Sequence, residues 1–461
     1  MAVTTLNDGD GSVSPRASKT KIISIIFLFL LSLLAFVCQT EFTSRAYTVG
    51  FKEPIALLLV THGMWWIIWP IQVISIAVFR TGHRLMYQRR LGEYEPVNSP
   101  GQIHDPNLSV TKPVNVYKYF KKSIVKQVHN VYHTSILIYE ANVNGDTRTE
   151  QINQLIDSNP HISNTSSLRA CFKSALGTPS IKYILTKSAI ITMVLTIAGF
   201  SWYGAMSMTY ASDVTAIYNC SAFTAYAFAI PILKERFSWL KVSSVVIAIA
   251  GVFIVAYSGD AADGDNPYPY RFWGNLIISA GAVLYGYYEV LYKKYTCIPA
   301  HLATIITPRR QLTFSNFIMA LFGTFTFLFL FTSMALVHIF HIHHFNLFDY
   351  GDKTGLIWFY IIGSLISNIL FSAAFLSLMA LTNPVLSSVS SLTTIFLIGL
   401  TEWVLFGIKL SFQQLLGDMF VIAGFVLLTA ASWKEISEGN DDDDVENVST
   451  FSFPVSTDGT I

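Results

Sequence analysis

The chain has 461 residues, of which 52% are hydrophobic and 13% are charged, and its mean hydropathy is +0.47. Because soluble proteins usually carry about 25% charged residues, this composition favours an integral membrane protein. The formal net charge of +1 gives no basic excess, and we expect no nucleic-acid partner. The four cysteines show no metal-ligand spacing, so neither a disulfide framework nor a metal site is expected.

The first apolar segment follows a polar tail, residues 1–20, that we expect to be cytosolic. Lys19 and Lys21 give this segment the basic flank of a signal peptide. No small-residue cleavage site follows, since residues 39–41 are polar. We therefore interpret the segment as an uncleaved membrane helix.

Ten segments are long and apolar enough to span a membrane, which takes about 20 residues of helix. They cover residues 21–40, 54–79, 184–208, 211–232, 239–257, 272–292, 312–338, 356–380, 383–407 and 412–432. The first two fall within residues 21–79, the next three within 184–257 and the last five within 272–432. An acidic tail over 433–461 follows, and we expect it to be disordered.

Lys and Arg gather in three connecting segments, which all fall on one side when ten helices are threaded through a membrane. These segments lie within residues 80–183, 233–241 and 293–310, whereas Asp260 and Asp349 fall on the other side. An excess of Lys and Arg marks the cytosolic face, so both termini are predicted to be cytosolic. Two halves of five helices, an odd number, have opposite orientations. The predicted fold is therefore an all-α integral membrane protein with ten transmembrane helices in two inverted five-helix repeats.

The long basic segment over 80–183 interrupts the first half, and we expect it to be cytosolic and partly disordered. Within it, apolar residues recur at helical spacing over 117–131, with lysines on the remaining surface. Such a helix either lies on the anionic cytosolic leaflet of the bilayer or packs on the protein's own loops. We expect that deleting about residues 95–170 leaves function intact.

Two stretches, residues 212–258 and 382–432, resemble one another. Each holds two apolar segments, with Glu235 or Glu402 at the end of the first. In the second segment a Ser-aromatic pair precedes an Ala-Gly pair, which ends at Gly251 or Gly424. Duplicated helical halves are typical of secondary transporters.

Enzyme signatures are not found: the sequence has no phosphate loop, no metalloprotease motif and no nucleophile elbow. We therefore expect a protein that is not an enzyme and that needs no cofactor. Transport without an ATP-binding domain would depend on solute gradients or exchange.

Polar side chains inside apolar spans need a partner or a function. Tyr285, Tyr288 and Tyr292 share one face of the sixth predicted span, and Glu289 lies beside that face. Aromatic faces suit ring-bearing or cationic solutes, whereas the alternative for Glu289 is an ordinary surface pair with Lys293.

Amide and hydroxyl side chains in the fourth, eighth and ninth spans are further candidates, although such groups also hold helices together. The substrate-binding candidates are Tyr218, Asn219, Tyr285, Tyr288, Glu289, Asn368, Ser387 and Ser391.

Other polar residues have more ordinary interpretations. Glu402 sits deep in its span without a close basic neighbour, and burial favours the protonated form of a carboxyl group, so it is the candidate for proton coupling. Asp213 and Asn383 stand at helix starts and are interpreted as caps. Four histidines near the end of the seventh span, at 338, 341, 343 and 344, suit a metal or a pH sensor. Because no acidic residue or cysteine lies close by, we interpret them as an interfacial helix end. The glycosylation sequons at Asn164 and Asn447 fall on the predicted cytosolic side and should be unmodified.

The duplicated unit resembles the EamA-type drug/metabolite transporter superfamily. The stretch YASDVTAIYNCSAFTAYAFAIPILKERFSWLKVSSVVIAIAGVFIVAYSGD and the following FWGNLIISAGAVLYGYYEVLYKKY are similar to solute carrier family 35, in particular its F subfamily. The second half departs from the first, with a longer spacer between Glu402 and Ser411.

This resemblance implies alternating access around a solute site between the halves, and F-subfamily members have been linked to thiamine. Few basic residues fall inside the predicted spans, which argues against a phosphate-rich solute. We expect a carrier of a thiamine-like or other neutral or cationic metabolite across a vacuolar, Golgi or endoplasmic reticulum membrane. The alternatives are a non-transporting scaffold or receptor that uses the cytosolic loop, and a nucleotide-sugar antiporter. The sequence is also compatible with a homodimer.

Overall fold

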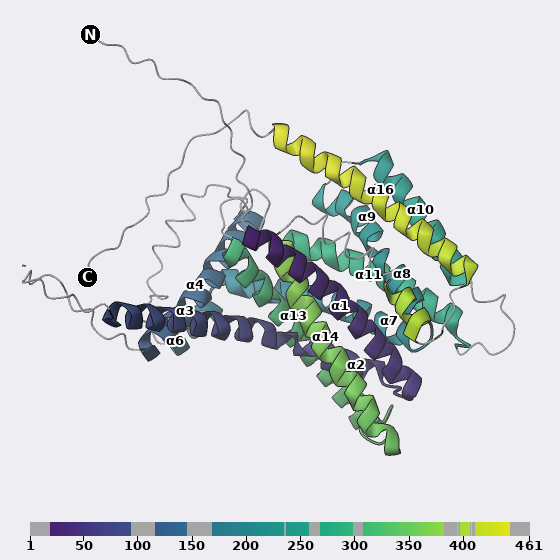
Figure 1. Cartoon of the computed structure of the whole chain (residues 1–461), viewed down its shortest axis with the longest axis horizontal. Coiled ribbons are helices and arrows are strands. Elements are labelled where there is room, and N and C mark those ends of the chain that lie inside the picture. Colours follow the sequence, from purple (N-terminus) through teal and green to yellow (C-terminus); the bar gives the residue numbers. More distant parts are fainter. Residues whose placement is uncertain are drawn as a thin grey trace, which may run out of the picture. The chain divides into compact units, whose positions relative to one another are not determined.

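The computed structural model describes residues 19–93, 116–144, 168–234, 237–257, 268–297, 308–381, 394, 397–405, 407 and 411–442. All regular elements within these ranges are helices (Figure 1). The chain forms two compact units. Unit 1 comprises residues 1–193 and 295–390, and unit 2 comprises 194–294 and 391–461. Most of the predicted N-terminal tail and much of 80–183 lie outside the described residues. Of the tail that was predicted to be disordered over 433–461, residues 433–442 are described and are helical, and the rest lies outside the described residues.

Six of the described helices are long and apolar enough to cross a membrane. They are Ile26–Val49, Pro54–Met86, Pro179–Met206, Ala211–Leu233, Thr313–Ile339 and Gly351–Phe375, which correspond to predicted spans one to four, seven and eight. Shorter apolar helices, Trp239–Val255 and Phe412–Leu428, stand where the fifth and tenth were predicted. The sixth predicted span is helical over Arg271–Tyr295, but this helix is not among the six that are apolar enough to cross a membrane. The ninth lies partly outside the described residues, which are helical over 397–405.

In unit 1, α1 (Lys19–Val49) packs along α14 (Thr354–Leu381) (Figure 1). Their buried hydroxyl groups on Thr43 and Ser364 form a hydrogen bond of 2.8 Å. Gly363 of α14 lets the ring of Phe42 approach, because a Cβ at this position would lie 2.8 Å from that ring. Small residues that permit close helix contact are typical of membrane helices.

The second predicted span is discontinuous. It consists of α2 (Pro54–Thr61), a 3-10 turn, η1 (Gly63–Ile67), and α3 (Ile68–Glu93). The turn packs on Gly323 of α13 (Pro308–Ile339), where a Cβ would lie 2.5 Å from the backbone nitrogen of Trp66. A glycine at 323 is therefore what allows the broken segment to lie against α13.

α4 (Val116–Tyr139) packs against α3, α13 and α6 (Leu168–Leu176), after which a π-helical turn, η2 (Glu140–Asn144), follows. Val128 and Val131 of its apolar face are buried, whereas Tyr117 is 74% exposed. Gln127 Nε2 donates a hydrogen bond to the Val73 carbonyl at 3.0 Å. The second half of α4 thus packs on the protein itself, which is the second of the two alternatives given for this helix. A deletion of residues 95–170 would remove this packed helix, and the survival of function after that deletion stays a prediction.

Unit 2 contains the second half of α7 (Pro179–Met206), then α8 (Ala211–Asn219) and α9 (Ser221–Leu233), which are separated by Cys220. α10 (Trp239–Tyr257) and α16 (Phe412–Asp442) lie side by side (Figure 1). α11 (Arg271–Tyr295) completes the described long helices of the unit.

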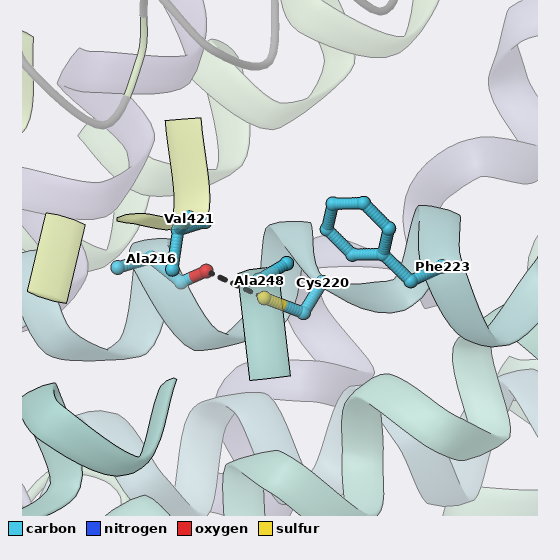
Figure 2. Close-up of a cluster of buried hydrophobic side chains, with 5 residues drawn as sticks. All are labelled: Ala216, Cys220, Phe223, Ala248 and Val421. Atoms are coloured by element: carbon cyan, nitrogen blue, oxygen red, sulfur yellow. Dashed lines mark hydrogen bonds between the residues drawn. The ribbon is translucent and has the colours of Figure 1, made fainter. Parts of the chain in front are cut away.

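The contact between α10 and α16 depends on glycines from the repeated Ala-Gly pairs. A Cβ on Gly251 would lie 2.6 Å from the Gly417 carbonyl oxygen, and one on Gly424 would lie 2.6 Å from that of Ser244. Beside this seam, Cys220 and Val421 belong to a small buried core cluster (Figure 2). The glycine of each Ala-Gly pair thus permits close backbone contact between α10 and α16.

Candidate functional site

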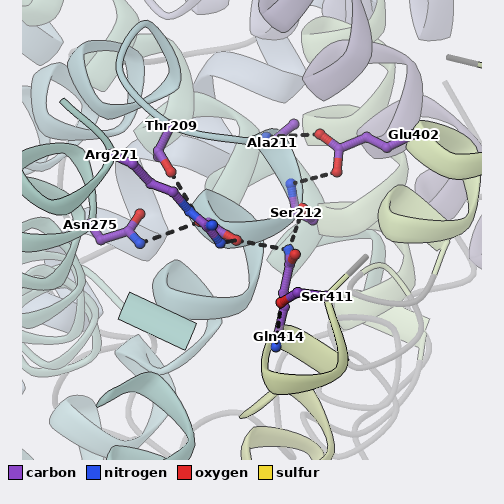
Figure 3. Close-up of polar contacts among 9 residues, drawn as sticks. Thr209, Ala211, Ser212, Arg271, Asn275, Glu402, Ser411 and Gln414 are labelled. Atoms are coloured by element: carbon purple, nitrogen blue, oxygen red, sulfur yellow. Dashed lines mark hydrogen bonds and ion pairs between the residues drawn. The ribbon is translucent and has the colours of Figure 1, made fainter. Parts of the chain in front are cut away.

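The start of α8 carries a buried ion pair. Arg271, the first residue of α11, points its Nε at Asp213 Oδ2 over 2.7 Å and its Nη2 at Oδ1 over 3.1 Å (Figure 3). Asp213 is 0% exposed, and the Arg271 side chain is 10% exposed. Asp213 was interpreted as a helix cap, and this was wrong: Tyr210 is the N-cap residue and makes no side-chain cap bond. The carboxylate instead neutralises a buried guanidinium, which would be costly to bury alone.

Further donors converge on Asp213. Thr209 Oγ1 and Asn275 Nδ2 donate to Oδ2 at 3.0 and 3.3 Å, and Gln414 Nε2 donates to Oδ1 at 2.8 Å. Gln414 also donates to Ser212 Oγ at 2.9 Å. Because these residues belong to α8, α11 and α16 or the turn before α8, one carboxylate ties three helices together. Such charge-assisted bonds are stronger than hydrogen bonds between neutral groups.

Glu402 binds the amino end of α8. Its Oε1 accepts a hydrogen bond from the Ala211 backbone N–H at 3.0 Å, and its Oε2 accepts one from Ser212 at 3.3 Å. The first N–H groups of a helix have no partner inside the helix and carry partial positive charge. Glu402 therefore caps a helix almost two hundred residues away in sequence. Its role in proton coupling stays a prediction.

A third carboxyl group, Asp418 of α16, belongs to the same environment. It is 6% exposed, and Asp213, Glu402 and Arg271 are the charged groups that act on it. Asp418 Oδ1 has no hydrogen-bond partner. Arg271, Gln414 and Asp418 were not predicted from the sequence, although Asp418, a charged residue inside the apolar segment 412–432, was a visible signal.

A cluster of tyrosine rings lies elsewhere in unit 2. The rings of Tyr218 and Tyr285 are 4.8 Å apart between centroids, and those of Tyr285 and Tyr288 are 5.1 Å apart. Tyr292 continues the row, 6.3 Å beyond Tyr288. Glu289 is close enough for its charge to act on the hydroxyl groups of both Tyr218 and Tyr285.

This tyrosine cluster, Tyr218, Tyr285, Tyr288 and Tyr292, adjoins the break between α8 and α9. Tyr218 and Asn219 are the last two residues of α8, directly before Cys220. Helix breaks inside a membrane are tolerated where they line a cavity or find protein partners. The predicted candidates in this region therefore come together, with ring faces and one carboxylate that match a cationic or ring-bearing solute.

The other candidates lie apart from this cluster. Asn368 is in unit 1, where its Oδ1 accepts a hydrogen bond from the Trp65 indole N–H at the broken second span. This contact gives Asn368 a role in holding helices together. Ser387 and Ser391 lie outside the described residues.

The histidines after α13 also belong to unit 1. His343 Nε2 lies 3.1 Å from each carboxylate oxygen of Glu53, and the rings of His338 and His341 contact His344. In the described parts of the chain, no group of three or more His, Cys, Asp or Glu side chains is placed to hold a metal ion. The contact with Glu53 joins this segment to the start of α2.

The long apolar helices and their buried polar contacts define a multi-pass helical membrane protein. No family model matches the chain. It is 26% identical to an uncharacterized transporter of Schizosaccharomyces pombe over 227 residues, 48% of this chain and 62% of the relative. It is 19% identical to solute carrier family 35 member F3 of Mus musculus over 170 residues, 37% of this chain and 36% of the relative. The human member F3 is 22% identical over 114 residues, 25% of this chain and 26% of the relative.

The chain thus spans less than two thirds of the length of each of these relatives. One solved crystal structure superposes with a TM-score of 0.36 at 14% identity, over 69% of this chain and 92% of that one, a likeness too low to support an argument. The sequence relatives confirm the resemblance to solute carrier family 35 transporters that the duplicated unit predicted.

Proposed function

We propose that the protein is a secondary transporter that moves a small polar organic solute across an endomembrane by alternating access. The observation that carries this proposal is the tyrosine cluster beside Glu289 at a broken helix, in a chain whose relatives are named as transporters. Transporters commonly build solute sites at such broken helices.

The chemistry of the cluster favours a neutral or cationic solute, of which thiamine is an example. Ring faces attract cations, and the Glu289 carboxyl group, an acceptor for a cationic or hydrogen-bonding solute, lies close to two of the tyrosines. A diphosphate would instead need basic groups. Arg271 is engaged by Asp213, so this arginine does not favour the nucleotide-sugar alternative.

The ten-helix arrangement with two inverted repeats also belongs to the proposal, and helix pairings inside each unit support it. In unit 1 the first predicted helix packs on the eighth, as α1 on α14. In unit 2 the third approaches the sixth, because a Cβ on Gly281 of α11 would overlap Ser201 of α7. A shift of five helices relates these two pairings. The fifth and tenth helices, α10 and α16, are themselves counterparts and pack together.

Uptake into proteoliposomes tests the proposal, with labelled thiamine, amino acids and nucleotide-sugars as probes. Replacing Tyr285 by Ala removes a ring face and should weaken the apparent affinity for a cationic solute by about 2- to 30-fold, the equivalent of about 0.5–2 kcal/mol. Tyr270→Ala is the matched control, because Tyr270 is 62% exposed. Uptake of every probe no faster than into empty vesicles would favour a scaffold or receptor, and uptake of nucleotide-sugars alone would favour the antiporter.

A further inference from the structure

The buried network in unit 2 contains more acid than base. Asp213, Glu402 and Asp418 are 0%, 2% and 6% exposed. Arg271 forms its ion pair with Asp213 and so balances one of three carboxyl groups. Buried carboxylates without compensation are costly, so such a site holds a proton, a cation or additional donors.

The hydrogen-bond donors are distributed unequally among the three acids. Asp213 receives bonds from Thr209, Arg271, Asn275 and Gln414. Glu402 receives the two backbone N–H groups at the start of α8. Asp418 Oδ1 has no partner, although the residue is buried. Donors stabilise the ionised form, and this asymmetry therefore singles out Asp418.

Most of the charged groups around Asp418 also disfavour its ionised form. Two of the charged groups that face it, Asp213 and Glu402, have its own sign, and the third, Arg271, is bound to Asp213. Cys220, at the break between α8 and α9, lies close enough for the charge of Asp418 to act on its thiol, and this thiol donates to the Ala216 carbonyl at 3.6 Å. The nearest atoms of α10 around the neighbouring Gly417 belong to Val255 and to the backbone of Gly251. Like charges and burial both favour a neutral carboxyl group.

We propose that Asp418, rather than Asp213 or Glu402, holds the proton that this protein exchanges during transport. This inference rests on the proposed transport function. In the exchange, the Asp418 carboxylic acid releases its proton to water and becomes a carboxylate, and it takes up a proton in the reverse step. Arg271 acts on both Asp213 and Asp418, so a movement of its guanidinium toward Asp418 would stabilise the carboxylate and promote release.

Infrared spectroscopy of the purified full chain in lipid, compared between the wild type and variants, tests the proton site without any solute. The carbonyl stretch of a protonated carboxyl group should be present in the wild type and in Glu402→Gln, and should be lost in Asp418→Asn. Asparagine has nearly the shape of the neutral acid, and a thermal melt verifies that the variant folds. A band that survives in Asp418→Asn, or that disappears in Glu402→Gln, would overturn the assignment.

Uptake with and without an imposed pH gradient tests the link to transport, with the probe solute that the wild type takes up. The gradient should accelerate uptake by the wild type and by Gln413→Ala, whose side chain is exposed on the same helix. In Asp418→Asn, the uptake rate with the gradient should equal the uptake rate without it. A gradient effect that persists in Asp418→Asn refutes the coupling. If the wild type transports no probe while the Asp418 band is present, the proposed function fails and the proton site stands alone.

Discussion

Arg271 and Asp213 show how much a single buried contact contributes to unit 2. The pair is bidentate, and almost no solvent reaches it. Replacing Arg271 by Met leaves Asp213 as a buried unpaired charge, which typically costs about 3–5 kcal/mol of stability. We expect a large drop in the melting temperature of the purified protein. Lys122→Met, at an exposed position of α4, is the control.

The double variant Asp213→Asn with Arg271→Met distinguishes charge from packing. Because both charges are then removed, it should be more stable than Arg271→Met alone. A double variant that melts below Arg271→Met would show that the amide and thioether fail for steric reasons, and that the ion pair is not the main term.

Single residues were predictable where the pattern was local. The helical spacing of Tyr285, Tyr288 and Tyr292 predicted a common face, and their rings are in contact. The Arg271–Asp213 pair joins residues 58 positions apart, and no local spacing indicates such a partner. The same holds for Glu402, which looked unpaired in sequence because its partners are backbone groups.

His133 of α4 gives a prediction about pH at the same scale. Burial, and then the neighbouring His129 and Arg310, lower the pKa of His133 from 6.5 to about 3. An unfolded chain therefore binds a proton below pH 6.5 that the folded chain does not, so folding stability falls as the pH drops through this range.

Thermal melts between about pH 7 and about pH 5 check this dependence, since the imidazole titrates there when unfolded. The wild-type melting temperature should decrease on acidification, and the decrease should be smaller in His133→Gln, which has no titrating ring. Equal slopes for the two proteins would show that His133 does not contribute.

At the scale of elements, the seam between α10 and α16 depends on the absence of side chains. A Cβ on Gly251 would meet Gly417 O at 2.6 Å and Val421 N at 2.7 Å, so Gly251→Leu must force the helices apart. Overpacking of this kind costs about 1–3 kcal/mol or more. We expect a lower melting temperature for Gly251→Leu than for Gly204→Leu, where a Cβ meets nothing within 4 Å. Equal melting of both variants would contradict close contact at this seam.

Elements were predictable where a helix is long and uniformly apolar, which is why six spans appear close to their expected positions. The breaks at η1 and at Cys220 were not predicted, because each segment is long and apolar enough overall to cross a membrane as one helix. The break at η1 depends on Gly323, more than 250 residues further along the chain, which makes room for the Trp65–Trp66 backbone. Tertiary packing, absent from any local pattern, decides where these helices bend.

At the scale of the whole molecule, each compact unit draws on both halves of the sequence. Unit 1 pairs α1 with α14, and unit 2 pairs α10 with α16. Neither half of the sequence alone contains both partners of either pair. Internal similarity predicted two repeats in sequence, but it did not predict that the compact units would combine helices from both.

Splitting the chain between α10 and α11 tests this interleaving. Expressed alone, residues 1–260 and 261–461 should each be degraded or aggregate, because α1 and α10 lose the partners that bury their packed faces. Co-expressed, the two fragments should restore a protease-resistant complex that co-purifies, since every buried helix pair is again available. The measurement is the yield and protease resistance of each fragment with and without the other. A first fragment that is stable alone would mean that α10 and α1 fold without α16 and α14, and that the paired units are not the folding units of this protein.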